Sequence, residues 1–340
     1  MSSSTEVLVI GAGVLGLSTA AELLRRGHGV TVVDPGSGNA SAVAAGMIAP
    51  AFETLADWRG SDGRLDRGDL FRAARAQWSA FATAFDLPLY REGAEWRGPD
   101  LEMVASQLRW LGFPAERTDD AVVTPADGRT EPDAALTRLG SLPGLTVLPG
   151  RVLSLTTDGT RWTAMLADGS GLAARSVILA TGAETGLELP EPVARLVSQV
   201  QPIRGQIAVT DRPLVERAVR GPAGYVAPSP GGAVIGATME AGRTDLVPDL
   251  ARGAAMLNAC LAQIGQPDDV PVTWRVGVRG ATPDGLPMAG PSGLAGLSLA
   301  LAPRRNGWLL GPLVARTVAD GIEGRAAGPF APALDPRRFG

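Results

Sequence analysis

Three glycines and one acidic residue near the start of the chain have the types and spacing of a dinucleotide-binding turn. Gly11, Gly13 and Gly16 follow one apolar run, and Asp34 ends a second, β-branched run. In a strand–turn–helix unit the first glycine permits the tight turn, the second lets the backbone approach a pyrophosphate, and the third lets the helix pack close to the sheet. The N-terminus of that helix favours phosphate. We therefore predict that this segment binds the adenosine end of FAD or NAD.

The acidic residue restricts which nucleotide fits. The carboxylate of Asp34 can accept hydrogen bonds from both hydroxyls of an adenosine ribose, and its charge argues against a 2′-phosphate and so against NADP. The motif alone does not separate FAD from NAD. A unit of the same shape with a glycine-rich turn and no ligand is the alternative interpretation.

The composition excludes several other kinds of chemistry. The chain contains no lysine, one histidine (His28) and one cysteine (Cys260). A Schiff-base or P-loop lysine, a Ser-His-Asp triad and a histidine-based metal site are excluded, and no metal is expected. We expect His28 to be a solvated turn residue at the end of the strands opposite the nucleotide, and Cys260 to be a buried structural thiol in a helix. A single cysteine forms no intrachain disulfide, which favours a reducing compartment.

Length and charge indicate a two-domain α/β enzyme. The 340 residues are 45% hydrophobic and 19% charged, with a net charge of −4 and no basic block. Nucleic acid is therefore not an expected partner. A short polar leader at 1–5 is followed at once by the first strand, and neither a signal peptide nor an apolar run of ~20 residues is visible. We expect a cytoplasmic protein without a membrane partner, and a homo-oligomer is left open.

Hydrophobic periodicity predicts the elements that must position these residues. Helices are predicted at 17–26, 66–85, 100–111 (capped by Asp100), 131–139, 247–264 and 308–322. Strands are predicted at 7–10, 30–34, 87–97, 145–148, 152–156, 161–166, 176–180, 203–210, 224–228, 233–239, 274–278 and 297–301. This alternation predicts that the chain leaves the nucleotide-binding part and returns to it more than once.

A stretch of small residues follows the second strand where a pure NAD-binding domain usually continues to a third. It includes Ala45, Gly46 and Met47 within the segment 42–50. Small side chains in series allow a large flat ligand to lie against the backbone. The alternative is a small-residue helix start in a tightly packed core.

An ordered set of blocks resembles the D-amino-acid oxidase superfamily of FAD-dependent oxidoreductases, and is most similar to its glycine oxidase (thiamine-biosynthetic) branch. The blocks are the glycine turn with Asp34, then 44–50 (AAGMIAP), 177–183 (VILATGA), 202–206 (PIRGQ), 225–228 (YVAP) with 235–239 (IGATM), 277–287 (GVRGATPDGLP) and 305–310 (RNGWLL). They cover nearly the whole chain in the family's order.

This resemblance implies a fold and a cofactor. The fold class is α/β, with a discontinuous Rossmann-type FAD-binding domain and a mainly antiparallel α+β substrate-binding domain. The FAD-binding domain is expected at 1–86, 131–197 and 276–340, and the substrate-binding domain at 87–130 and 198–275. FAD is expected to be bound non-covalently.

The resemblance also implies an activity and its site. FAD would accept a hydride at N5 from a small amine or α-amino acid, giving an imine, and oxygen would be the acceptor that reoxidises FAD with release of hydrogen peroxide. The implied catalytic residues are Arg279, which would bind the substrate carboxylate, Tyr225 and Arg305. The implied cofactor-binding residues are Gly11, Gly13, Gly16, Asp34, Ala45, Gly46, Met47, Val152, Thr181, Gly182, Arg279, Asn306 and Gly307.

Elementary chemistry is consistent with these roles. Hydride transfer needs a neutral amine whose Cα–H lies over the flavin, and a fixed arginine can orient Cα through a bidentate pair with the carboxylate. No acid–base residue is strictly needed, which suits a chain without a usable histidine. A surface ion pair is the alternative role for Arg279, and a hairpin aromatic is the alternative for Tyr225.

The chain departs from the branch immediately before Arg305. Ala302, Pro303 and Arg304 stand where a glycine, a histidine and an aromatic residue are usual. Proline removes a backbone donor and Arg304 introduces a charge. This departure favours, as an alternative, a flavin-dependent amino-acid dehydrogenase or a biosynthetic tailoring oxidase with another acceptor or a larger substrate. A flavin-binding protein without turnover is a third interpretation.

Overall fold

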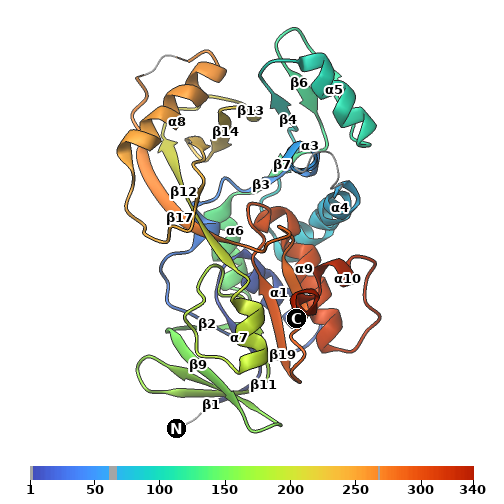
Figure 1. Cartoon of the computed structure of the whole chain (residues 1–340), viewed down its shortest axis with the longest axis vertical. Coiled ribbons are helices and arrows are strands. Elements are labelled where there is room, and N and C mark those ends of the chain that lie inside the picture. The colour runs from blue at the N-terminus through green and yellow to red at the C-terminus, as the bar shows by residue number, and fades with distance from the viewer. Residues whose placement is uncertain (1–2, 61–66, 267–268) are drawn as a thin grey trace.

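A mixed sheet, parallel along β19-β11-β1-β2-β8, carries the predicted nucleotide turn at the end of its strand β1 and forms the lower part of the molecule in Figure 1. The computed structural model describes residues 3–60, 67–266 and 269–340. The main path of this sheet is β18-β19-β11-β1-β2-β8, and β9 and β10 extend it from β11. The strands are β1 Ser3–Ile10, β2 Val30–Asp34, β8 Thr146–Pro149, β9 Val152–Thr157, β10 Trp162–Leu166, β11 Gly171–Leu179, β18 Met288–Pro291 and β19 Leu297–Leu301.

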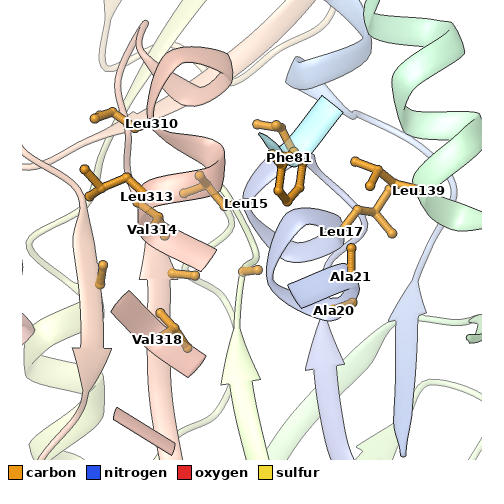
Figure 2. Close-up of a cluster of buried hydrophobic side chains, with 14 of the residues drawn as sticks. Leu15, Leu17, Ala20, Ala21, Phe81, Leu139, Leu310, Leu313, Val314 and Val318 are labelled. Atoms are coloured by element: carbon orange, nitrogen blue, oxygen red, sulfur yellow. The ribbon is translucent and has the colours of Figure 1, made fainter. Parts of the chain in front are cut away.

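The central strand β1 is apolar throughout its second half because both of its faces are covered. Val7 and Val9 pack in a cluster with helices α1 (Val14–Arg25) and α9 (Gly307–Ile322), whereas Leu8 and Ile10 pack on the other side with β9, β10 and α7 (Glu191–Val197). A strand buried on both faces reads as a continuous apolar run rather than an alternating one. Figure 2 shows the first cluster, in which Leu15 and Leu17 of α1 lie among side chains of α9, α4 (Gly68–Phe85) and α6 (Pro132–Gly140).

A proline inside α9 is accommodated by a neighbouring helix. Pro312 has no N–H to donate to the carbonyl oxygen of Trp308 four residues earlier. The indole Nε1–H of Trp78, a fully buried residue of α4, donates to that oxygen at 3.0 Å and to the carbonyl oxygen of Leu309 at 3.1 Å. Packing of α4 against α9 therefore satisfies the backbone group that the proline would otherwise leave without a donor.

The second sheet forms the upper part of the molecule in Figure 1. Its main path is β16-β12-β15-β14-β13-β4-β6-β5, and β17 pairs with the other edge of β12. The strands are β4 Ala94–Trp96, β5 Glu116–Arg117, β6 Val122–Thr124, β12 Gln201–Thr210, β13 Ala218–Gly221, β14 Gly224–Ser229, β15 Gly232–Gly236, β16 Glu240–Ala241 and β17 Thr273–Ala281. Helix α8 (Leu250–Gln263) packs on β12, β14 and β15, and α5 (Leu101–Trp110) packs on β5 and β6.

Most predicted elements are present, with differences at particular residues. The predicted strand 87–97 is confined to β4, and β1 already begins at Ser3, inside the predicted leader. Asp100 precedes α5 but has a φ of 59° and makes no side-chain capping bond, so the predicted cap is wrong. Residues 1–2 of the leader and residue 66 of a predicted helix lie outside the described residues. The other helices are α2 (Ala40–Val43), α3 (Pro50–Gly60) and α10 (Ala331–Leu334), and β3 (Met47–Ile48) pairs with β7 (Gly128–Arg129).

One predicted domain boundary lies within a strand of the second sheet. The boundary expected between residues 275 and 276 falls inside β17, which pairs with β12 along its whole length. The division itself stays a prediction. Among the described residues, no helix combines the length and apolar character needed to cross a bilayer.

His28 differs from the solvated turn residue that the sequence predicted. Its ring lies between two carboxylates, with Nδ1 2.7 Å from Glu6 of β1 and Nε2 3.1 Å from Glu323 at the end of α9. The hydrogen bond to Glu6, opposed by partial burial, raises the pKa of His28. His28 therefore joins the first strand to the last long helix.

Candidate cofactor and substrate site

The glycine turn places its backbone where no side chain would fit. Gly11 has a φ of 111°, and a Cβ there would lie 2.3 Å from the carbonyl oxygen of Ala180, which directly follows the neighbouring strand β11. A Cβ at Gly16 would lie 2.0 Å from the carbonyl oxygen of Gly11. The turn and the close approach of α1 to the sheet therefore require these two glycines.

The carboxylate of Asp34 is held at the end of β2 by backbone donors. Its Oδ2 accepts from the N–H of Ala12 at 2.6 Å and its Oδ1 accepts from the N–H of Gly36 at 2.7 Å. A carboxylate has about four acceptor positions, so two of them stay free for hydroxyl donors. Asp34 is thus fixed in orientation and still able to bind a ribose.

The segment that follows β2 closes over the N-terminus of α1. The N–H of Val14 donates to Oγ of Ser41 at 3.0 Å, and the indole Nε1–H of Trp308 donates to the carbonyl oxygen of Ser41 at 3.1 Å. Ser41 lies in α2, which packs on β17. This contact brings the N-termini of α1 and α9 to the same place.

A pocket open to solvent lies where these two N-termini meet the C-terminal part of β17. It is lined by Gly13, Val14, Leu15, Ala40, Ser41, Ala44, Ala180, Gly182, Val278, Arg279, Gly280, Ala300, Ala302, Pro303, Arg304, Arg305, Gly307 and Trp308. Its charged lining residues are three arginines. Small residues dominate the rest of the lining, so the walls are largely backbone.

The pocket contains some of the predicted site residues and not others. Gly13, Gly182, Arg279, Arg305 and Gly307 line it. The remaining predicted residues lie outside its lining: Gly11, Gly16, Asp34, Ala45, Gly46, Met47, Val152, Thr181, Tyr225 and Asn306. Of these, Ala45 is buried beside β3, Val152 is buried at the start of β9, and Asn306 is buried immediately before α9.

Arg279 lies across the face of the second sheet. A Cβ at Gly205 of β12 would lie 2.2 Å from its Nη1, so the guanidinium occupies the space that a side chain would fill there. That Nη1 is buried and has no hydrogen-bond partner among the described residues. Burial lowers the pKa of Arg279, although no other group in a protein retains its charge as firmly. Within the described part of the chain, the pocket therefore contains a cation without an ion-pair partner.

Tyr225 lies on the same sheet in a similar way. It pairs across the strands with Gly236, where a Cβ would lie 2.8 Å from the phenolic oxygen of Tyr225. Burial, partly offset by the nearby charge of Arg279, raises the pKa of Tyr225 to about 12. The phenol therefore stays neutral and can donate a hydrogen bond.

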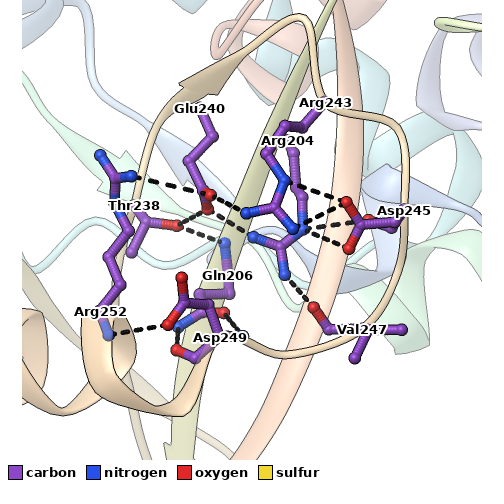
Figure 3. Close-up of polar contacts among 9 residues, drawn as sticks. All are labelled: Arg204, Gln206, Thr238, Glu240, Arg243, Asp245, Val247, Asp249 and Arg252. Carbon is purple, nitrogen blue, oxygen red and sulfur yellow. Dashed lines mark hydrogen bonds and ion pairs between the residues drawn. The ribbon is translucent and has the colours of Figure 1, made fainter.

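The opposite face of β12 is fixed by a polar network, which Figure 3 shows. The fully buried Arg204 contacts Glu240 at 2.5 Å and donates from Nε to the carbonyl oxygen of Asp245 at 3.0 Å. Its neighbour Gln206 donates from Nε2 to the carbonyl oxygen of Asp249 at 2.7 Å. Successive side chains of a strand point to opposite faces, so these contacts hold the strand on which Gly205 supports Arg279.

Arg305 is paired, unlike Arg279. It contacts Glu53, and its Nη2 donates to Oδ1 of Asp57 at 2.6 Å. Both carboxylates lie on α3 and also pair with arginines of other elements: Glu53 with Arg220 of β13 at 2.7 Å, and Asp57 with Arg67 at 3.0 Å. Arg305 therefore belongs to an alternating ion-pair cluster beside the pocket.

The charges in this cluster set each other's ionisation. Although burial alone would raise it, the pKa of Glu53 is lowered to about 2 by the guanidinium groups of Arg305 and Arg220. The carboxylate of Glu53 in turn raises the pKa of Arg305. Arg305 consequently already has two carboxylate partners, and a substrate carboxylate would have to compete with them.

Helix α3, which carries these carboxylates, was not predicted. Its N-terminus is capped by Asp127, which accepts from the N–H of Ala51 at 2.7 Å and of Phe52 at 3.3 Å. Burial, partly offset by these hydrogen bonds, raises the pKa of Asp127 to about 7. The sequence did contain a signal, because Glu53 and Asp57 are four residues apart after a proline and so share one face of a helix.

Comparisons with known proteins agree with this arrangement. A family model described as FAD dependent oxidoreductase matches residues 6–321. The glycine oxidase of Pseudomonas aeruginosa is 29% identical over 99% of this chain and 98% of its own length. The bifunctional tRNA 5-methylaminomethyl-2-thiouridine biosynthesis protein MnmC of Chromohalobacter salexigens is 30% identical over 89% of this chain, and the chain spans 46% of that protein.

A solved structure shares the fold along the whole chain. The crystal structure of glycine oxidase from Geobacillus kaustophilus matches with a TM-score of 0.79 and 24% identity over 98% of both chains. The predicted fold class, α/β with parallel and antiparallel sheets, is confirmed by this likeness and by the two sheets.

Proposed function

This chain belongs to the FAD dependent oxidoreductase family, and from that premise we propose that it oxidises a small amine or α-amino acid to the imine, in the manner of a glycine oxidase. It is an FAD-dependent amine or amino-acid oxidoreductase, and FAD is its cofactor. The single observation that carries the proposal is the buried Nη1 of Arg279, which has no hydrogen-bond partner among the described residues and lies beside the pocket.

The residues present suit FAD. The glycines let the backbone of the turn approach α1 and the sheet closely. Asp34 keeps acceptor positions for ribose hydroxyls, and the N-termini of α1 and α9 meet in the pocket. Helix N-termini favour negative charge, so the N-terminus of α1 can hold the pyrophosphate of FAD and that of α9 can lie beside its electron-rich ring. We propose that Gly11, Gly13, Gly16, Asp34, Ala45, Gly46, Met47, Val152, Thr181, Gly182, Arg279, Asn306 and Gly307 bind the cofactor.

Arg279 would bind and orient the substrate. A carboxylate offers two oxygens to the fork of a guanidinium, and the resulting bidentate pair fixes the direction of Cα. Tyr225, which lies on the same sheet face and stays protonated, would donate to the same carboxylate. Gly205 leaves the space in which the guanidinium lies against the sheet.

The pocket also favours the neutral form of the substrate amine. Its charged lining residues are arginines, and a cationic environment disfavours an ammonium group and lowers the amine pKa. The only histidine lies at the other end of α1, about 18 Å away for a 12-residue helix, so it cannot exchange a proton with the substrate. When bound, FAD supplies the hydride acceptor at N5 and is reoxidised by oxygen with release of hydrogen peroxide.

Replacement of Arg279 tests the carboxylate role. We expect Arg279→Ala to raise KM for carboxylated amines by about 30-fold or more, because truncating one partner of a buried charge-assisted pair costs about 2–5 kcal/mol, and about 1.4 kcal/mol is a factor of ten. The matched control is Arg275→Ala on the same strand, whose exposed side chain pairs with Asp133. Steady-state kinetics with peroxide detection, on protein of equal flavin content, gives both values. An unchanged KM would exclude Arg279 as the carboxylate ligand.

The activity itself is tested by a substrate screen. Purified protein should be yellow, and anaerobic mixing with glycine, sarcosine, proline or a D- or L-amino acid should bleach the flavin. Peroxide on readmission of air separates an oxidase from other flavoenzymes. Protein that takes up no FAD, or flavin that none of these amines reduces, would refute the proposal.

A second candidate is a dehydrogenase or tailoring oxidase with another acceptor or a larger substrate. Arg304, whose charge replaces the usual aromatic residue, lines the pocket and favours this candidate. The similarity to a tRNA biosynthesis protein means that the absence of a nucleic-acid partner stays a prediction. Reduction of an artificial dye without peroxide formation would support the dehydrogenase. The cytoplasmic location also stays a prediction.

A further inference from the structure

Arg304 is a second cation in the pocket that has no ion-pair partner among the described residues. Its half-buried side chain lines the same pocket as Arg279. Within 3–60, 67–266 and 269–340, its guanidinium makes neither a hydrogen bond nor an ion pair, and only its backbone N–H is bonded, to the carbonyl oxygen of Gly280 at 2.9 Å. Burial and the adjacent charge of Arg305 lower the pKa of Arg304.

The neighbouring carboxylates form their ion pairs with arginines other than Arg304. Glu53 is bonded to Arg305 and Arg220, and Asp57 to Arg305 and Arg67. These two acids therefore face three arginines before Arg304 and Arg279 are considered. No acidic residue lines the pocket among the described residues. Among the described residues, the arginines of this region therefore outnumber the two carboxylates that pair with them, and the region has an excess of positive charge.

The backbone fixes Arg304 in this position. Its φ is 53°, in the left-handed region that residues other than glycine seldom adopt, and Ala302 two residues earlier has a φ of 58°. The Nη1 of Arg304 would lie 3.9 Å from a Cβ at Gly285, beside the guanidinium of Arg67. An arginine held beside another arginine and partly removed from water is favoured only when an anion joins it.

We propose that Arg304 binds a second carboxylate of the substrate, so that the enzyme prefers amines or amino acids with two carboxylates. Arg279 takes the carboxylate on the carbon that is oxidised, and Arg304 takes the other. This inference rests on the proposed amine oxidation and names its substrate class. Arg305 has no part in the preference, because its guanidinium is already held by Glu53 and Asp57.

Substrate pairs that differ by one carboxylate test the preference. Suitable pairs are sarcosine with iminodiacetate, and alanine with aspartate in each enantiomer. We expect kcat/KM of the wild-type protein to favour the dicarboxylate, and Arg304→Gln to reduce that preference by about 10- to 100-fold, as for loss of one charge-assisted hydrogen-bond pair. Arg304→Lys should retain part of it. Arg316→Gln, which removes an exposed arginine of α9, is the matched control and should change nothing.

A binding measurement without turnover separates this role from a structural one. Succinate and butyrate have the same chain length and differ by one carboxylate, and their binding can be followed by the shift of the flavin absorbance. We expect the wild-type protein to bind succinate more tightly, and Arg304→Gln to remove the difference while leaving the affinity for FAD unchanged.

The possible failures are distinguishable. If no amine reduces the flavin, the proposed function fails. If monocarboxylates are oxidised and the wild-type protein shows no preference for dicarboxylates, the inference about Arg304 alone is overturned. It is also overturned if Arg304→Gln weakens FAD binding and leaves the preference intact, because Arg304 would then face the cofactor.

Discussion

At the scale of residues, the site depends on where side chains are missing as much as on where they are present. Arg279 and Tyr225 lie flat on the second sheet because Gly205 and Gly236 leave room beneath them. A guanidinium lying on a rigid strand loses little freedom when it binds a carboxylate. The glycines are therefore positioning residues for the two side chains that we propose bind the substrate.

Gly205→Ala should displace Arg279. The added methyl group would lie 2.2 Å from Nη1, so the guanidinium must move, and we expect KM for carboxylated amines to rise at least tenfold with little change in flavin content. Gly171→Ala is the control, since the nearest side-chain atom to its Cβ is 4.0 Å away. The methyl group added at Gly205 would also lie 2.8 Å from the carbonyl oxygen of Thr238, so far-UV circular dichroism should accompany the kinetics to check that the variant is folded. A normal KM would show that Arg279 does not need this space.

The sequence identifies candidate site residues but not the contacts between them. The resemblance of motifs points to Arg279, and the structure places this residue in the lining of the pocket. Its dependence on Gly205 could not be predicted, because it requires the register between two strands far apart in the chain. The pairing of Arg305 was missed for a similar reason: its partners lie on α3, whose buried acids hide the usual apolar pattern of a helix.

At the scale of elements, the long helices were predictable and their mutual support was not. Apolar residues at helical spacing identified α4 and α9 within a few residues. The sequence of α9 alone indicates a defect, since Pro312 cannot donate to the carbonyl oxygen of Trp308. Only the packed structure shows that Trp78 of α4 supplies the donor. The N-terminus of α9 lines the pocket, so this contact supports the site.

Removal of that donor should destabilise the protein unless the proline is removed too. We expect Trp78→Phe to lower the free energy of unfolding by about 1–3 kcal/mol beyond the loss of packing, because a buried carbonyl loses its partner. Pro312→Ala restores a backbone N–H, so the double variant should recover about 1 kcal/mol of that loss. Urea unfolding of the wild-type protein, the two single variants and the double variant gives the coupling energy. Strict additivity would show that the indole hydrogen bond has no such compensating role.

At the scale of the whole molecule, the first strand and the last long helix are joined at the far end of the nucleotide sheet. His28 connects Glu6 of β1 with Glu323 after α9. Beside it, Arg26 donates to Glu22, Asp320 and Glu323 at 2.7–2.8 Å. The sequence predicted the position of His28 in a turn. It could not show the carboxylates around it, since they come from segments about 300 residues apart in sequence, which only folding brings together.

The contribution of His28 to stability should depend on pH in a defined direction. Its pKa is raised, so its contribution is complete below about pH 6.5 and is lost as pH rises through the folded value. The pKa values of Glu6 and Glu323 are lowered, so their contribution is present above about pH 4.5. The difference in Tm between the wild-type protein and His28→Gln should therefore be larger at pH 6 than at pH 9. An equal difference at both values would contradict the ion-pair role.

The route of the chain through the pocket has a consequence for biosynthesis. The walls come from residues as early as Gly13 and as late as Trp308, and β19 returns to the first sheet only after the second sheet has been made. At a ribosomal rate of about 5–20 residues per second, roughly 15–60 s separate the synthesis of the first wall from that of the last. Until residue 279 has been made, the nascent chain has the glycine turn and Asp34 but neither Arg279 nor the N-terminus of α9. The pocket that we propose for the flavin can therefore be completed only once nearly all of the described chain has left the ribosome.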